Sequence, residues 1–307
     1  MEQKQILEQL KGLTTETINQ DSTNIDIVPT IEKLRIINNE DQKVAAAITD
    51  HLPAIADAVD AITIALKNGG RLIYLGAGTS GRLGILDAVE CPPTYGVDYN
   101  TVVGLIAGGD AAFIKAQEGV EDREDCAIAD LQSVNLTQFD IVCGIAASGR
   151  TPYVIGGLKH ARNVGCKTIA VACNSNSLIG QYADYKIEVS AGAEVVTGST
   201  RMKAGTTQKL ILNMLSTATM INLGKTYKNL MVDVKTSNAK LEARAKKIIM
   251  EATDVDFETA AYYLQLANNH VKTAIVMILN QVDYATAQSL LQNADGVIRK
   301  IIVRNPL

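Results

Sequence analysis

Apolar residues near the start of the chain follow helical spacing. The first thirty residues are mostly polar, and Ile31, Leu34 and Ile37 then begin a helical pattern. A second apolar set, spaced i, i+4, i+7 and i+11, lies at residues 55–66 and is followed by Gly69-Gly70. Because glycine commonly follows a helix C-terminus, this pattern predicts an irregular arm and two helices, the second ending before Gly69.

From residue 71 onward, short apolar runs alternate with helical stretches. The runs lie at residues 71–75, 101–108, 139–147, 167–173 and 185–190. Between them we predict a short helix from Arg82 to Glu90, stopped by Pro92-Pro93, one long helix over 110–131, and a helix over 152–165. Continuously apolar strands that alternate with helices indicate an α/β fold, with a parallel sheet covered by helices on both faces.

The last third of the chain has no further strand pattern after about Lys235. A polar loop opens a helix that is apolar on most faces from Leu210 to Leu223, which predicts burial or a subunit interface. Short helices follow, with Asp256 and Asp283 as predicted N-caps. We therefore expect three parts: an arm and helix over 1–50, an α/β domain over 51–235, and a small all-helical domain over 240–307.

Composition narrows the class of protein. The net charge of −4, the 4% aromatic content and the absence of Trp argue against a nucleic-acid surface. We recognise no signal peptide and no apolar run of the roughly 18 residues that a membrane span needs. Five cysteines form no CxxC pair, and three histidines have no zinc-ligand spacing. These features predict a cytoplasmic protein with free thiols, no nucleic-acid or membrane partner and no structural metal.

Two loops have the composition of an anion site. "GAGTSGR" (76–82) and "ASGRT" (147–151) each join a predicted strand to a predicted helix. Glycines admit close approach to backbone N–H groups, hydroxyls donate hydrogen bonds, and a helix N-terminus favours an anion, so the pair suits a phosphate group. A third candidate loop opens the long helix, where Arg201 and Lys203 either supply positive charge or lie on the helix surface. The predicted binding residues are Thr79, Ser80, Ser148, Gly149, Thr151, Ser199 and Thr200.

Two other nucleotide-binding motifs fit less well. Gly76, Gly78 and Gly81 match the dinucleotide fingerprint, but the acidic Asp110 comes late and the intervening helix is short. A Walker A loop fails because Arg82-Leu83 stand where Lys and Ser or Thr are needed. The alternative to a ligand site is that both glycine loops only turn the chain between strand and helix.

Glu90 is placed unusually, in "AVECPP". At the last turn of the predicted helix, the negative end of the helix dipole and the apolar neighbours Val89, Cys91 and Pro92 would both raise its pKa. A carboxyl of this kind suits a general acid working near neutral pH. The alternative is a solvated helix end.

A run of acids follows the second strand. Glu118, Glu121, Asp122, Glu124 and Asp125 have the appearance of a solvated helix face. Within the predicted helix, Glu118 and Glu121 are one turn apart and share that face.

Longer stretches carry a family resemblance. "GAGTSGRLGILDAVECPPTYG", "GIAASGRTPYVI" and "GAEVVTGSTRMKAGTTQK" resemble the SIS domain, a phosphosugar-binding α/β fold, and within it the N-acetylmuramic acid 6-phosphate etherase family. The resemblance runs from about Thr14 to the end. Ile18 stands where that family usually has an arginine, and Pro29 where it has a serine, so we leave the arm out of the predicted site.

The resemblance implies a carbon–oxygen lyase. The lactyl ether at C3 of N-acetylmuramic acid 6-phosphate would be cleaved by elimination and hydration, in cell-wall amino sugar recycling, giving N-acetylglucosamine 6-phosphate and D-lactate without cofactor or metal. The matching catalytic residues are Glu90, as proton donor, and Glu121, to which we assign the base role; Glu118 would touch the sugar or tune its neighbour.

SIS domains commonly pair, so we expect a homodimer. The tail from near Ala252 resembles a ubiquitin-associated-like three-helix unit.

Two alternative functions are also compatible with these residues. A sugar-phosphate isomerase on the same fold would also remove a proton beside a carbonyl, but would need no acid for a departing lactate. A non-catalytic phosphosugar sensor, like the related glucokinase regulatory protein, would bind without reaction. The presence of both Glu90 and Glu121 favours catalysis.

Overall fold

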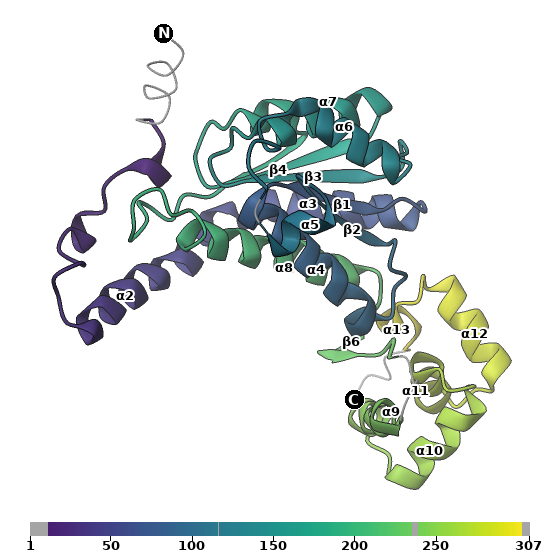
Figure 1. Ribbon diagram of the computed structural model, residues 1–307. Coiled ribbons are helices and arrows are strands. Elements are labelled where there is room, and N and C mark those ends of the chain that lie inside the picture. The colour runs from purple at the N-terminus through teal and green to yellow at the C-terminus, as the bar shows by residue number, and fades with distance from the viewer. Residues whose placement is uncertain (1–11, 116, 235–238, 303–307) are drawn as a thin grey trace. The chain divides into compact units, whose positions relative to one another are not determined.

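The computed structural model describes residues 12–115, 117–234 and 239–302 (Figure 1). Contacts divide the chain into two compact units. The first comprises Met1–Val89 and Tyr99–Ser216, and the second Glu90–Asp98 and Thr217–Leu307. The three-part division expected from the sequence stays a prediction. In the described part of the chain, no helix combines the length and the apolar character required to cross a membrane.

A five-stranded sheet forms the centre of the first unit. Its strands are β1 (Leu72–Gly76), β2 (Val102–Ile106), β3 (Ile141–Ala146), β4 (Lys167–Ala172) and β5 (Tyr185–Glu188). They are parallel throughout and lie in the order β2-β1-β3-β4-β5. Every residue of β1 and β3 is buried, as their continuous apolar runs predict. The predicted α/β class is confirmed.

Helices cover both faces of this sheet (Figure 1). On one face, α6 (Glu124–Ser133) packs against α7 (Pro152–Val164), and their apolar residues join those of β1, β3 and β4 in one core. On the other lie α3 (Leu52–Lys67), α4 (Gly78–Tyr95) and α8 (Lys203–Asn222). Asp87 of α4 connects this second layer, because its carboxylate accepts hydrogen bonds from Tyr74 of β1 and from Asn213 and Ser216 of α8. Burial raises the pKa of Asp87 even though all three donors favour the carboxylate.

The N-terminal segment begins with two short 3₁₀ turns, η1 (Thr14–Glu16) and η2 (Gln20–Ser22). The helix α2 (Thr30–Ile48) follows, as the apolar spacing from Ile31 predicts, and a third 3₁₀ turn, η3 (Thr49–His51), leads into α3. A fourth, η4 (Ile179–Tyr182), lies between β4 and β5. The 3₁₀ turns of the arm are irregular structure, in agreement with the polar composition of this region.

The predicted long helix over residues 110–131 is wrong. The structure has a short helix, α5 (Asp110–Ile114), and then α6, which begins only at Glu124. Gly119 has φ of +80°, a left-handed conformation that interrupts a right-handed helix. Glu118 and Glu121 therefore lie on a loop, and the face they were expected to share on one helix does not exist.

The predicted helix stop at Pro92-Pro93 is also wrong. Helix α4 continues through both prolines to Tyr95, and it ends where the backbone N–H of Gly96 donates to the carbonyl of Pro92. Gly96 has φ of +67°, the left-handed conformation that commonly ends helices. Each proline removes one backbone N–H bond to the residue four before it, and only Thr94 and Tyr95 follow in the helix.

The second unit is mainly helical. Its helices are α9 (Ala239–Thr253), α10 (Phe257–Leu266), α11 (Val271–Asn280), α12 (Tyr284–Asn293) and α13 (Ile298–Ile301). The predicted N-caps Asp256 and Asp283 are confirmed, since each side chain accepts a 2.8 Å hydrogen bond from a backbone N–H three residues later. A two-stranded hairpin, β6 (Thr226–Tyr227) and β7 (Leu230–Met231), was not predicted because its strands are too short to show periodicity.

Candidate functional site

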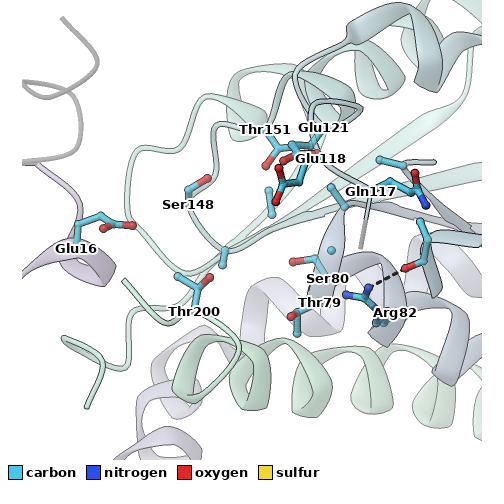
Figure 2. A pocket seen from close by; sticks show the side chains of 16 residues that line it. Glu16, Thr79, Ser80, Arg82, Gln117, Glu118, Glu121, Ser148, Thr151 and Thr200 are labelled. Carbon is cyan, nitrogen blue, oxygen red and sulfur yellow. Dashed lines mark hydrogen bonds between the residues drawn. The ribbon is translucent and has the colours of Figure 1, made fainter. Parts of the chain in front are cut away.

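A cavity of about 350 Å³ opens where β1 and β3 end (Figure 2). These strands are neighbours in the sheet, and the chain leaves β1 toward one face and β3 toward the other. Ligands of open parallel sheets bind at such a switch point, because backbone N–H groups and helix N-termini converge there. The wall is formed by Glu16, Ala77, Gly78, Thr79, Ser80, Arg82, Ala107, Ala112, Gln117, Glu118, Glu121, Ala146, Ala147, Ser148, Thr151 and Thr200.

The loop after β1 brings two predicted hydroxyl residues to the cavity. Gly78 has φ of +52° and begins α4, so Thr79 and Ser80 lie in the first turn of that helix. Ser80 is buried, and its hydroxyl donates a 2.9 Å hydrogen bond to Oε1 of Gln208 on α8. Nε2 of Gln208 has no partner within the described residues. The second helix layer thus fixes one hydroxyl of the loop.

The loop after β3 supplies Ser148 and Thr151. Gly149 does not line the cavity; its φ is +71°, and its N–H donates to the carbonyl of Ala146. A Cβ at this position would lie 2.4 Å from Cβ of Ser177, so only glycine fits. Gly149 shapes the turn that points its neighbours into the cavity.

Glu118 and Glu121 lie together on the cavity wall beside Thr151 (Figure 2). The carbonyl of Glu121 accepts a 2.9 Å hydrogen bond from the N–H of Tyr153, in the first turn of α7. The Tyr153 hydroxyl donates to Asp130 of α6 at 2.6 Å, and burial together with this bond raises the pKa of Tyr153. The acidic loop is therefore anchored by its backbone, which leaves its carboxylates directed to the cavity.

Among the described residues of the cavity wall, Arg82 is the one arginine or lysine. Its guanidinium donates to the carbonyls of Ala112 and Phe113 at 2.7 and 2.8 Å. It thereby fixes the end of α5 and, with it, the start of the loop that carries Glu118. Its charge also offsets part of the negative charge of the nearby carboxylates.

The third predicted loop contributes less than expected. Thr200 lines the cavity, Ser199 does not, and Arg201 is exposed. The first N–H groups of α8, those of Lys203 and Ala204, donate at 2.9 Å to the carboxylate of Glu194. Since a carboxylate already occupies this helix N-terminus, it is not available to a second anion.

Lys203 is a structural residue, because its ammonium is buried against Glu40 of α2 and also donates to the carbonyl of Ala191. Burial alone would raise the pKa of Glu40, but hydrogen bonds from Lys203, Lys43 and Asn19 lower it to about 2. Of the two charges expected near this loop, neither reaches the cavity.

Glu90 is not where the sequence argument placed it. It is exposed on α4, five residues before the helix ends, so the predicted dry setting at a helix terminus is wrong. It does not line the cavity of its own chain. At 1.5 Å per residue, it lies about 15 Å along the helix axis from Ser80.

Sequence reasoning missed several residues of the wall, among them Arg82, Gln117 and Glu16. Glu16, from the N-terminal arm, lines the cavity near Ser148 and Thr200 (Figure 2). The sequence signal for Glu16 is "TE", which matches the family pattern near the start, but the departure at the neighbouring Ile18 argues against a role for the arm. Ile18 is exposed and lines no part of the cavity.

Comparisons with known proteins agree with this architecture. Residues 54–162 match the glucokinase regulatory protein N-terminal SIS domain, and residues 123–218 match the SIS domain. A solved structure of a protein from E. coli CFT073 has a TM-score of 0.50 at 16% identity, covering 66% of this chain and 96% of that chain. This likeness shows the fold alone.

Curated relatives match nearly the whole chain. The N-acetylmuramic acid 6-phosphate etherase of Geobacillus sp. (strain WCH70) is 57% identical over 95% of this chain and 99% of its own length. That of Bacillus subtilis (strain 168) is 54% identical over 95% of this chain and 96% of its own length. The chain therefore belongs to the N-acetylmuramic acid 6-phosphate etherase family.

Proposed function

We propose that this chain is a carbon–oxygen lyase that cleaves the D-lactyl ether of N-acetylmuramic acid 6-phosphate. The observation that carries the proposal is the convergence of two hydroxyl-bearing strand–helix loops and one carboxylate-bearing loop on a single cavity. The relatives' names supply the substrate. The hydroxyl-bearing loops suit binding of the phosphate group, and the carboxylate-bearing loop suits proton transfer.

The phosphate is held by the loops after β1 and β3. Thr79, Ser148 and Thr151 offer hydroxyl donors close to the first turns of α4 and α7, whereas the hydroxyl of Ser80 already donates to Gln208 and holds the turn in place. Gly149 adopts the left-handed conformation that the loop after β3 needs. Thr200 adds a hydroxyl from the loop before α8. Ser199, which lies off the wall, has no direct part in this arrangement.

Glu121 removes the proton from C2 of the open-chain sugar. The neighbouring C1 aldehyde acidifies that proton, and its loss is followed by cleavage of the C3–O bond. The lactate oxygen takes a proton from an acid, and water then adds its hydroxyl to C3 and its proton to C2. The products are D-lactate and N-acetylglucosamine 6-phosphate, so atoms balance with one water consumed. Glu118, beside Glu121, contacts the sugar.

Glu90 donates the proton to the departing lactate, and it does so in the cavity of a second copy of the chain. Two observations support this assignment. Glu90 is about 15 Å along α4 from Ser80, too far to serve a sugar held at its own loop. Leu86 and Val89, on the same side of α4, are apolar yet 45% and 51% exposed. An exposed apolar strip beside a carboxylate suits an interface, so we propose a homodimer with shared sites.

The reaction is tested with the purified chain and N-acetylmuramic acid 6-phosphate in H₂¹⁸O. We expect D-lactate without label and N-acetylglucosamine 6-phosphate with ¹⁸O at C3. Label in lactate would contradict elimination and hydration. Absence of lactate, with tight binding of the phosphosugar, would contradict the lyase assignment itself. Glu121→Gln should bind substrate and release no lactate.

The shared site is tested by mixing two inactive variants. Glu90→Gln and Glu121→Gln are unfolded together and refolded, so that mixed dimers form. If Glu90 acts in the partner's cavity, each mixed dimer contains one complete site, and lactate release returns to about a quarter of the wild-type value. Each refolded variant alone is the control. No recovery, with mixed dimers demonstrated by differently tagged chains, would contradict the assignment.

We further propose that the enzyme works in the cytoplasm, in recycling of cell-wall amino sugars. Support comes from its five free cysteines, four of which are buried, and from the phosphorylated substrate of its relatives. Fractionation of cells that express the tagged chain, with marker proteins for each compartment, tests this location.

A further inference from the structure

Glu16 is held on the cavity wall by an arm that is tied to the sheet. The Nδ2 group of Asn174, the second residue after β4, donates to Oγ1 of Thr15 at 3.1 Å and to the carbonyl of Ala147 at 3.0 Å. The N–H of Thr15 donates back to Oδ1 of Asn174 at 3.4 Å. Asn174 and Thr15 are both buried, at 2% exposure each. One amide therefore joins the arm to the loop that carries Ser148.

The arm is also fixed on the other side of Glu16. Asn19 donates from Nδ2 to the carbonyl of Ala193 at 3.1 Å, and the hydroxyl of Ser22 donates to the carbonyl of Val195 at 2.8 Å. Leu13 is buried ahead of it. Residues 13–22 are thus bound at several points to loops that follow the sheet, and Glu16 has little freedom to leave the cavity.

The carboxylate of Glu16 has no hydrogen bond or ion pair with any residue in the described ranges. It is partly buried on the wall, close to where a Cβ of Gly198 would lie, and the hydroxyl residues Ser148 and Thr200 are its neighbours in the cavity (Figure 2). Holding an unpaired carboxylate in a partly buried position is unfavourable unless a donor meets it. No described residue of the wall donates to it, so its oxygens are available to a donor on a ligand.

We infer that Glu16 is a sugar-binding residue, which accepts a hydrogen bond from a neutral donor of the phosphosugar, a ring-carbon hydroxyl or the acetamido N–H. The phosphate and the lactyl carboxylate are excluded as partners by charge. Glu118 and Glu121 lie at another part of the wall, beside Thr151, so the substrate meets carboxylates on two sides (Figure 2). Glu16 thereby fixes the orientation of the sugar, and Asn174 is its positioning residue.

This inference rests on the proposed phosphosugar site, but its test does not require turnover. Binding of N-acetylglucosamine 6-phosphate and of inorganic phosphate is measured by calorimetry for the wild type and for Glu16→Gln, Glu16→Asp, Asn174→Ala and the matched control Glu32→Gln. Glu32 is an exposed carboxylate of α2 that pairs with Arg35.

We expect Glu16→Gln and Asn174→Ala to weaken phosphosugar binding by about 10-fold or more, as loss of a hydrogen bond to a charged group does. Inorganic phosphate should bind Glu16→Gln within twofold of wild type. Asn174→Ala should weaken both ligands, because its amide also holds the carbonyl of Ala147 in the Ser148 loop, and Glu32→Gln should change neither. Glu16→Asp should recover part of the loss. Equal weakening of both ligands by Glu16→Gln would mean that Glu16 only supports the fold, and unchanged phosphosugar binding would remove it from the site. Failure of wild type to release lactate would contradict the lyase and leave this comparison valid.

Discussion

The ammonium of Lys203 lies 2.5 Å from Oε2 of Glu40, and both side chains are at most 3% exposed. This ion pair joins α2 to the start of α8, which are 163 residues apart in the sequence. Lys43 pairs with the other oxygen of Glu40 from the same helix, and it is half exposed. The pair is thus a buried structural ion pair of the first unit, and neither residue lines the cavity.

Removing one partner of the pair should destabilise the chain strongly. Lys203→Met leaves a buried carboxylate with one exposed partner, and a broken buried pair typically loses about 3–5 kcal/mol of folding free energy. The combined variant Glu40→Leu with Lys203→Met should be closer to wild type, because no unpaired charge remains. Urea unfolding followed by circular dichroism measures both. A double variant less stable than Lys203→Met would contradict this account.

The same pair predicts how stability changes with pH. The folded pKa of Glu40, about 2, is below its ordinary value of 4.5, so its contribution is complete above about pH 4.5 and is lost as pH falls toward 2. The stability difference between wild type and Glu40→Gln should therefore shrink steadily over that window. Urea midpoints at pH 7, 4.5, 3.5 and 2.5 measure it, and a constant difference would show that Glu40 does not remain ionised in the folded chain.

Gln208 should act on the substrate only through Ser80. Gln208→Leu removes the acceptor of the Ser80 hydroxyl, and a neutral hydrogen bond contributes about 0.5–1.5 kcal/mol, which corresponds to about a 2- to 12-fold rise in KM. Ser80→Ala should give at least as large a rise. The combined variant should resemble Ser80→Ala, because both changes act on one hydroxyl. Steady-state lactate release measures all three, and fully additive effects would contradict the linkage.

Two glycines of the cavity loops should respond differently to alanine. Both have positive φ, which is unfavourable for alanine by roughly 1–2 kcal/mol. A Cβ at Gly119 would meet no atom within 4 Å, whereas at Gly149 it would lie 2.4 Å from Cβ of Ser177. Gly149→Ala should lose about 1–3 kcal/mol more than Gly119→Ala because of this overlap. Equal unfolding midpoints would show that the β3 loop relaxes without loss.

Gly119→Ala and Gly149→Ala should also differ in their effects on kcat and on phosphate affinity. Gly119→Ala alters the loop that carries Glu118 and Glu121, so kcat should fall with little change in phosphate affinity. Gly149→Ala alters the turn beside Ser148, so binding of inorganic phosphate should weaken. Lactate release and phosphate calorimetry measure the two effects, and the reverse pattern would contradict the assignment of phosphate to the β3 loop.

The sheet could be predicted from the sequence because its evidence is local. Continuous apolar runs and the polar loops that follow them predict strands, parallel pairing and the meeting of Thr79 with Ser148 at one edge. Glu121 reached the predicted site by family resemblance, since its acidic surroundings alone indicated a solvated face. The break at Gly119 was missed because a single glycine is also compatible with a continuous helix.

The arm could not be predicted for a different reason. The bonds between Thr15 and Asn174 join residues 159 positions apart, and neither local periodicity nor loop composition reports such a contact. Glu90 shows the opposite error. Of its apolar neighbours in sequence, Cys91 and Pro92 are buried, whereas Val89 is exposed on α4 as Glu90 is, so nearness in sequence did not mean a shared environment.

The interruption of the helix at Gly119 separates two tasks along the chain. Loops that directly extend β1 and β3 carry the hydroxyl groups, whereas Glu118 and Glu121 belong to the segment between α5 and α6, whose backbone is bonded to Tyr153 of α7. Such a segment can be exchanged between related proteins without rebuilding the sheet. A common fold that binds the phosphate group of its substrates can in this way acquire new reactions when a single stretch of about nine residues is replaced.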